Sequence, residues 1–271
     1  MGERKAFKDL ILSDNFMFGE VMSDKNICRM FLSELLKKDF VEIDFIAKEL
    51  TFDKIYYSQG VRLDIMAKDA SGKIYDIEMQ STNKKDIERR SRFYVSNIDK
   101  EYFPKGHKDY NELKDCYVIF ICTYDHVGKG YALYEKTSYY NHDPEMPCDD
   151  GAHLLILNAA YDREKSNIEL PIEEFLSIIN GVESNYSTAL ARDVSDRITE
   201  VKNDHGRELA YMTLEELIQD ERDEARAEGI NEGMMRGRAE GKTEGKAEGI
   251  AEVLRNLGMS EAEYQKILKR V

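Results

Sequence analysis

The sequence predicts an α/β fold whose elements run helix, strand, strand, strand, helix, strand, followed by further strands and a helical C-terminal third. Three features support this prediction. Short runs with the alternating or continuous apolar character of strands follow a helical N-terminal segment. A polar segment of helical character separates the first three runs from the later ones, and the pattern is helical from about Pro171 onward. A length of 271 residues suits one large domain, or one core with an appendage.

Each element is predicted from a local pattern. The residues Ser13-Asp14-Asn15, followed by apolar side chains, are typical of the start of a short helix. Ser23 is the expected N-cap of a second helix, in which apolar residues recur every three or four positions. Strands are then expected over residues 45–52, 61–67, 74–80, 117–121 and 154–157, and a helix over 86–100.

The composition excludes several classes of protein. The chain has 53 acidic residues against 39 lysines and arginines, and its net charge of −14 argues against a protein that coats nucleic acid or an anionic membrane. No apolar run approaches the roughly 18 residues of a spanning helix, so no membrane partner is expected. The four cysteines form no C-x-x-C pair, which favours buried thiols in a cytoplasmic protein over a zinc site or a disulfide framework.

The C-terminal third contains a repeat. Glycines recur every four residues from Gly229 to Gly249, and glutamates precede most of them. On a helix the acidic and basic rows would lie about 200° apart, so opposite charges would be too far round the helix to pair. Two interpretations remain open for this Glu-Gly repeat: a helix that forms a homo-oligomer with a second copy, or a flexible solvated linker. After the repeat, Gly258 and a capping box from Ser260 predict a small helical hairpin that contacts DNA or docks on protein.

The central hairpin is predicted in enough detail to set its register. Ala70-Ser71-Gly72 suits a three-residue loop with glycine in the left-handed position. If Asp69 pairs with Lys73, Asp64 on the first strand lies directly opposite Glu78 on the second.

Two carboxylates in this arrangement suggest a particular chemistry. Cross-strand partners have Cβ atoms about 5 Å apart, and carboxylates at that spacing repel each other unless a cation lies between them. Hard divalent ions favour such oxygen ligands, and Gln80 adds a third oxygen on the same face as Glu78. The alternative is an ordinary half-buried hairpin with a polar outer face.

The arrangement of Asp64, Glu78 and Gln80 belongs to a longer pattern. That pattern includes the opening Asp14-Asn15-Phe16-Met17-Phe18, the helix segment Arg89-Arg90-Ser91-Arg92-Phe93-Tyr94, the apolar strand over 117–121 and the Glu-Gly tail. Together these motifs resemble the PD-(D/E)XK nuclease family transposases, also called recombination-promoting nucleases. The resemblance implies a restriction-endonuclease-like fold, with a mixed central sheet flanked by helices and a helical C-terminal extension. It also implies Mg²⁺-dependent cleavage of DNA, with Mn²⁺ as a substitute ion.

The resemblance assigns roles to individual residues. Asp64 and Glu78 would bind the metal, with Glu20 from the first helix as a further acid. Gln80 is the departure from the pattern, because related nucleases most often have lysine there, and it would act by orienting water or through its carbonyl. Contacts with DNA phosphates are expected from the basic segment that contains Lys84, Lys85, Arg89 and Arg92.

These features predict four parts of the chain. A nuclease-like core over residues 1–182 precedes a helical extension over 183–225, the Glu-Gly repeat over 226–252 and the terminal hairpin over 253–271. Two functions follow as hypotheses: a metal-dependent DNA endonuclease of recombination or mobile elements, or a catalytically weak DNA-binding or regulatory protein that keeps the nuclease fold.

Overall fold

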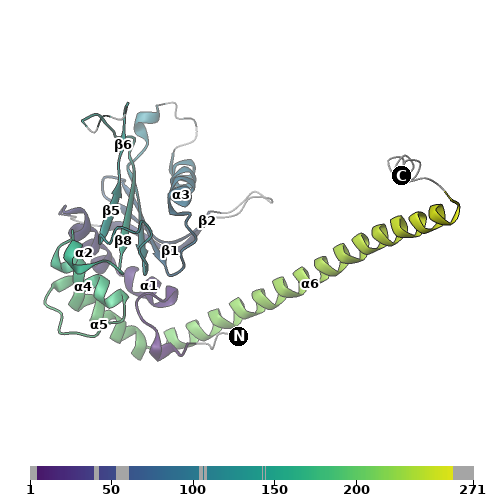
Figure 1. Cartoon of the computed structure of the whole chain (residues 1–271). Coiled ribbons are helices and arrows are strands. Elements are labelled where there is room, and N and C mark those ends of the chain that lie inside the picture. Colours follow the sequence, from purple (N-terminus) through teal and green to yellow (C-terminus); the bar gives the residue numbers. More distant parts are fainter. Residues whose placement is uncertain are drawn as a thin grey trace. The chain divides into compact units, whose positions relative to one another are not determined.

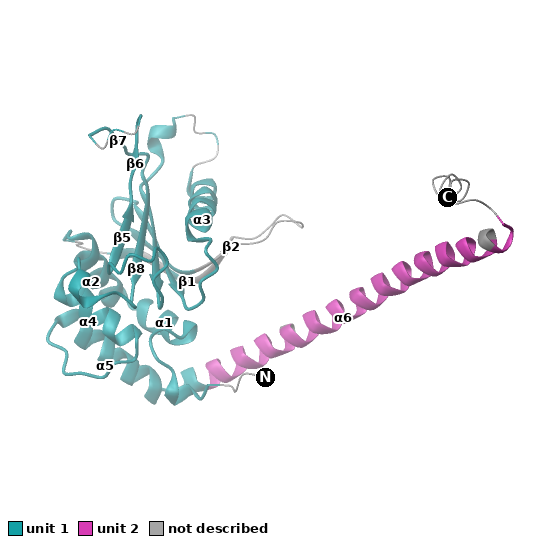
Figure 2. Cartoon of the chain, viewed as in Figure 1, with its two compact units in different colours: residues 1–208 teal, residues 209–271 magenta. Residues whose placement is uncertain are grey.

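The computed structural model describes residues 5–39, 43–52, 61–103, 106, 109–141, 143 and 145–258. The chain divides into two compact units, Met1–Glu208 and Leu209–Val271 (Figure 2). The first unit contains the sheet and its helices, and the second contains most of one long helix (Figure 1).

A six-stranded mixed sheet forms the centre of the first unit. Its strand order is β1-β2-β3-β4-β8-β5, and a separate two-stranded sheet pairs β6 with β7. The order arises because β1, β2 and β3 form an antiparallel meander, whereas β4 and β8 join β3 in parallel and β5 closes the far edge antiparallel. The strands are β1 Ile43–Phe52, β2 Val61–Asp69, β3 Ile74–Gln80, β4 Cys116–Cys122, β5 Leu133–Lys136, β6 Ser138–Tyr139, β7 Pro147–Cys148 and β8 Ala152–Asn158.

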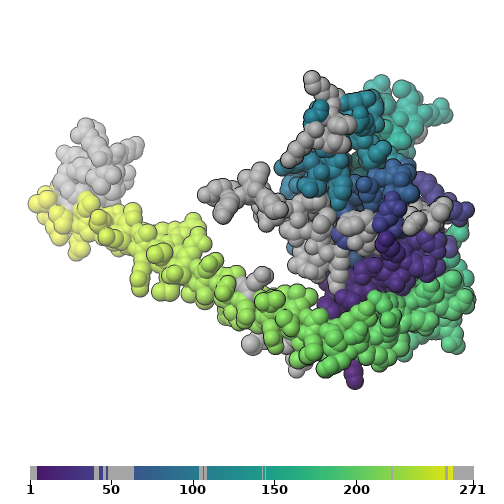
Figure 3. Space-filling view, turned by 180° about the vertical axis from the view of Figure 1, so that it is seen from behind, coloured from purple at the N-terminus to yellow at the C-terminus, as the bar shows by residue number. Residues whose placement is uncertain are grey.

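Helices cover both faces of this sheet. Helix α3 (Ile87–Tyr102) lies on one face, and α1 (Asn15–Met22), α2 (Lys25–Leu36), α4 (Leu170–Ile179) and α5 (Ala189–Asn203) gather on the other side (Figure 1). Segments far apart in the sequence meet there, because α5 packs against α1 and α2 (Figure 3). Short 3₁₀ turns lie at η1 Phe7–Asp9, η2 Tyr110–Glu112 and η3 Arg163–Lys165.

The parallel strands are buried on both faces, as their continuous apolar runs predict. Every residue of β4 is buried, and only Gln80 at the end of β3 is partly exposed. Under α3, the even-numbered side chains of β4 pack with Tyr94 and Ile98 of the helix in one apolar cluster. Tertiary burial of this kind is what fixes α3, whose Ile87, Tyr94 and Ile98 recur at helical spacing on one side.

The fold class and element order predicted from the sequence are confirmed. The N-cap of α2 differs: Asp24, not Ser23, is the cap, and its carboxylate accepts hydrogen bonds from the N–H groups of Asn26 and Ile27. The first compact unit extends through α5. The second helix predicted after Ser260 lies outside the described residues.

Helix α6 (His205–Asn256) runs through the Glu-Gly repeat without interruption. Its six glycines from Gly229 to Gly249 have only open space where a Cβ would be, within the part of the chain that is described. Neither α6 nor any other described helix combines the length and the apolar character needed to cross a membrane.

Candidate active site

The hairpin between β2 and β3 has the loop and register predicted from the sequence. Gly72 has a φ of 86°, the left-handed conformation that glycine adopts without strain. Its N–H donates to the Asp69 carbonyl oxygen (2.9 Å), and the Asp69 N–H donates to the Lys73 carbonyl oxygen (3.1 Å). The backbone pairs continue to Ile65 opposite Ile77. In this register the next two residues to face each other are Asp64 and Glu78.

At Asp64 and Glu78 the side chains, rather than the backbone, connect the two strands. The Glu78 Oε1 atom accepts a hydrogen bond from the Asp64 N–H (3.0 Å), and the Asp64 Oδ2 atom accepts one from the Met79 N–H (2.9 Å). Each carboxylate therefore holds the backbone of the opposite strand. This reciprocal arrangement fixes both acids at the point where the β2–β3 ladder ends.

Burial and crowding of negative charge dominate the electrostatics of this cluster. Glu78 is only 2% exposed because α3 covers its face of the sheet. This burial, together with the negative charge of Asp64, raises the pKa of Glu78 to about 7, although the Asp64 N–H and Arg90 oppose the change. The carboxyl thus exchanges its proton near neutral pH, which is a property of many functional carboxyl groups.

Asp76 is a third acid of the same face that the sequence prediction did not include as a site residue. It is fully buried, and neither of its carboxylate oxygens has a hydrogen-bond partner within the described residues. Burial and the neighbouring Glu78 raise its pKa well above the ordinary range, so the neutral form is favoured. The even spacing of Asp76, Glu78 and Gln80 places all three on one face, and this was the available signal in the sequence.

Arg90 of α3 brings a positive charge to the cluster. Its Nη2 atom lies 3.3 Å from the Glu78 Oε2 atom and 2.7 Å from the Tyr94 hydroxyl oxygen, and its Nη1 atom donates to the Gln80 Oε1 atom (2.7 Å). The guanidinium also lies over the rings of Tyr94 and Phe120, at 5.3 and 5.2 Å from the ring centroids. The sequence prediction did not assign a role to Arg90, although its four-residue spacing from Tyr94 places both on the face of α3 that contains Ile87 and Ile98.

The structure separates the other predicted site residues into different groups. Gln80 joins the cluster, and its amide Nε2 atom donates to the Met79 carbonyl oxygen (3.0 Å). Glu20 instead forms an ion pair with Arg207, whose Nε atom lies 2.9 Å from the Glu20 Oε2 atom. The four predicted DNA contacts, Lys84, Lys85, Arg89 and Arg92, are all exposed or partly exposed at the surface before and along α3.

The two carboxylates fit part of the coordination shell of a hard divalent cation. Asp64 and Glu78 offer oxygen ligands of the kind that Mg²⁺ binds, and this ion commonly keeps several waters and takes further oxygens from a phosphate substrate. Across the described part of the chain, no group of three or more His, Cys, Asp or Glu side chains is arranged to hold a metal. Asp64 and Glu78 thus supply two oxygen-bearing side chains of the type that such an ion takes.

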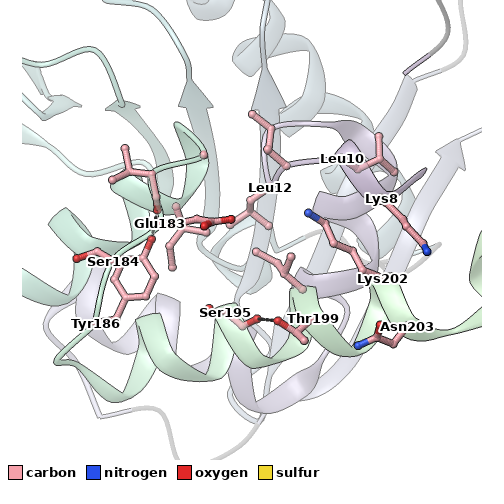
Figure 4. A pocket seen from close by; sticks show the side chains of 15 residues that line it. Lys8, Leu10, Leu12, Glu183, Ser184, Tyr186, Ser195, Thr199, Lys202 and Asn203 are labelled. Atoms are coloured by element: carbon pink, nitrogen blue, oxygen red, sulfur yellow. Dashed lines mark hydrogen bonds between the residues drawn. The ribbon is translucent and has the colours of Figure 1, made fainter. Parts of the chain in front are cut away.

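A separate pocket lies between the N-terminal segment, the end of α4 and helix α5 (Figure 4). It has a volume of about 570 Å³, and its polar lining includes Lys8, Glu183 and Lys202. The Thr199 hydroxyl at its wall donates to the Ser195 carbonyl oxygen (3.0 Å). None of the predicted site residues lines this pocket. The candidate active site is therefore the cluster at the end of the β2–β3 ladder.

The fold and the cluster together define a class. A mixed sheet flanked by helices, with paired carboxylates at the end of its central hairpin, is the arrangement of a restriction-endonuclease-like protein. A family model described as PD-(D/E)XK nuclease family transposase matches residues 15–200. The chain belongs to this family, which associates it with nucleases related to mobile elements, and such nucleases generally use divalent metal ions. No curated protein and no solved structure matches the chain.

Proposed function

We propose that the chain is a Mg²⁺-dependent DNA endonuclease that hydrolyses phosphodiester bonds in recombination or in the movement of mobile elements, with Mn²⁺ as a substitute ion. The observation that carries this proposal is the reciprocal pair of Asp64 and Glu78, which crowds negative charge into a site covered by α3. A bound divalent cation would relieve that repulsion. Family membership supports DNA as the substrate.

The residues of the proposed site have different roles in hydrolysis. Asp64 and Glu78 would hold the metal, which lowers the pKa of a bound water and stabilises charge on the phosphate when it is present. The backbone hydrogen bonds fix both carboxylates in advance, so little reorganisation is needed when substrate binds. We propose this site without Glu20, because that side chain is paired with Arg207. Gln80 remains part of the site through its contact with Arg90.

The basic segment before and along α3 is the proposed DNA-binding surface. Within the described residues, Lys84, Lys85, Arg89 and Arg92 form no ion pair with the acidic cluster, and Phe93 beside them is 48% exposed. Such side chains bind phosphates without reading the DNA sequence. In a plot of the logarithm of the DNA-binding constant against the logarithm of salt concentration, replacing any one of the four basic residues by alanine should therefore reduce the steepness of the slope by about one.

A plasmid nicking assay tests the proposed activity. The wild-type chain should nick DNA with Mg²⁺ or Mn²⁺, and Asp64→Ala should reduce the rate to background. Asp196→Ala, which changes an exposed aspartate on α5, is the matched control and should act as wild type. Equal rates in wild type and Asp64→Ala would remove Asp64 from the mechanism.

A catalytically weak DNA-binding or regulatory protein is the second candidate function. It is favoured by one observation: the side chain at the usual lysine position is Gln80, and its carbonyl is already bound to Arg90. No nicking by the wild type with either ion, combined with retained DNA binding, would select this function.

We further propose that α6 mediates self-association and that the protein acts in the cytoplasm, where its four thiols would stay reduced. The row of glycines in α6 would let the backbone of a second copy approach closely, and separated rows of acidic and basic side chains would then pair between copies. Sedimentation of a chain ending at Asp220 tests this. If the truncated and full-length chains form particles with the same number of copies, the proposal is refuted.

A further inference from the structure

The position of positive charge in the cluster differs from the position expected for this kind of nuclease. A neutral glutamine stands at position 80, whereas related sites most often have lysine there. The cationic group beside Glu78 comes instead from α3, since the Arg90 Nη2 atom lies 3.3 Å from the Glu78 Oε2 atom. That oxygen is not the one that accepts the Asp64 N–H. The arginine therefore contacts Glu78 on the oxygen that does not bind the neighbouring strand.

Both polar atoms of the Gln80 side-chain amide form hydrogen bonds within the protein. Its Oε1 atom accepts from the Arg90 Nη1 atom (2.7 Å), and its Nε2 atom donates to the Met79 carbonyl oxygen (3.0 Å). A metal or a water could take the carbonyl only by displacing a charge-assisted hydrogen bond, which is among the stronger interactions of a protein interior. In this arrangement Gln80 orients a guanidinium.

Arg90 is also held in place by two aromatic side chains. The Tyr94 hydroxyl accepts from its Nη2 atom, and the rings of Tyr94 and Phe120 flank the guanidinium. A planar guanidinium fixed by stacking and by hydrogen bonds keeps its full charge at every physiological pH. The side chain is still 24% exposed, so its charge acts at the solvent-facing side of the cluster as well as on Glu78.

We propose that Arg90 supplies the positive charge of the cleavage site, and that Gln80 is a positioning residue which, with Tyr94 and Phe120, holds the guanidinium beside Glu78. This inference rests on the proposed nuclease function. The charge that other sites place on the strand at position 80 is here carried by the adjacent helix. Its effect is electrostatic: it stabilises negative charge that develops on the phosphate during cleavage.

Three variants of the full-length chain test the proposal, and each is measured in two ways. Arg90→Met removes the charge, Gln80→Lys combined with Arg90→Met moves a charge to position 80, and Arg192→Met on α5 is the matched control. The first measurement is the rate of plasmid nicking with Mg²⁺. The second is the affinity for Mn²⁺ without DNA, by isothermal titration calorimetry.

Arg90→Met is expected to reduce nicking by about a hundredfold, as loss of one preorganised charge-stabilising group does. Measured at pH 8.5, where Glu78 is mostly ionised, its Mn²⁺ affinity should be unchanged or up to about tenfold tighter, because removal of a neighbouring cation leaves the two carboxylates more attractive to a metal. The double variant should recover about tenfold or more of the lost rate. The control should match wild type in both measurements.

Other outcomes overturn the proposal. Parallel losses of nicking and Mn²⁺ affinity in Arg90→Met would show that the arginine merely holds the cluster together, and wild-type nicking would show that its charge is not used. If Arg90→Met does not fold, Arg90→Lys and Arg90→Gln make the same comparison, and equal rates in these two variants would overturn it. A wild-type chain that nicks with no metal refutes the proposed function and this inference together, whereas active Arg90→Met refutes this inference alone.

Discussion

Replacement of Glu78 by glutamine should stabilise the metal-free protein at pH 8, although it removes a residue of the proposed site. Glutamine has nearly the same shape and can still accept the hydrogen bond that the Asp64 N–H donates to the Glu78 Oε1 atom. The charge is what changes. A carboxylate at position 78 is buried beside Asp64, whereas an amide has no charge to desolvate.

The size of the effect follows from the pKa of Glu78. Burial and Asp64 raise it from 4.5 to about 7, which corresponds to about 3 kcal/mol at roughly 1.4 kcal/mol for each pKa unit. Well below pH 4.5 the Glu78 carboxyl is protonated in both the folded and the unfolded chain, so its burial carries no cost of ionisation. As pH rises from 4.5 to 7 the unfolded chain releases the proton first, and the folded state loses stability. The pKa of about 7 already includes the opposing effect of Arg90, so Glu78→Gln should gain about 3 kcal/mol at pH 8.

Urea denaturation at pH 5 and pH 8, in a metal chelator, measures this difference. Near-ultraviolet circular dichroism of tyrosine is the suitable signal, because the chain has 16 tyrosines and no tryptophan. The exposed Glu101→Gln on α3 is the matched control and should change the free energy of unfolding by less than about 0.5 kcal/mol at either pH. The reasoning fails if Glu78→Gln is less stable than wild type at pH 8, or if its effect is the same at both pH values.

Three further predictions concern the metal, the loop and the long helix. Because Glu78 must lose its proton to bind a metal, the Kd for Mn²⁺ should fall roughly tenfold from pH 6 to pH 8 and level off above that pH; calorimetry that shows no pH dependence would contradict this. Gly72→Ala should lower the free energy of unfolding by about 1 kcal/mol in urea, because φ at that position is 86°. Gly237→Ala with Gly241→Ala should raise helicity while weakening self-association in sedimentation, whereas a solvated α6 would show the gain in helicity alone.

Much of the first unit could be predicted because its signals are local. Ala70-Ser71-Gly72 specifies the loop, and the Asp69–Lys73 pair then sets which residues of β2 and β3 face each other. The continuous apolar run at 117–121 predicts a strand buried on both faces, and β4 is such a strand. The predicted N-cap of α2 is one residue too early, because Ser23 and Asp24 are both residue types that cap helices well. Only the backbone geometry selects between them.

The site was predictable only to the extent that it lies on one hairpin. Asp64 and Glu78 are related by strand register, which short-range sequence features determine. Arg90 was missed because its contact with Glu78 depends on how α3 packs across the sheet, and helical spacing alone does not say which strand a helix faces.

The sequence by itself determined the order of elements, the hairpin register and the family, since each rests on patterns within short stretches of chain or on their succession. The tertiary structure decided the chemical environment. Glu78 and Asp76 are buried under α3, and this burial raises the pKa of both carboxyl groups. Glu20 forms an ion pair with Arg207. The tertiary structure also placed the Arg90 guanidinium against Gln80. Burial and charge proximity depend on which elements pack together, and that packing brings residues distant in sequence within a few ångströms of one another.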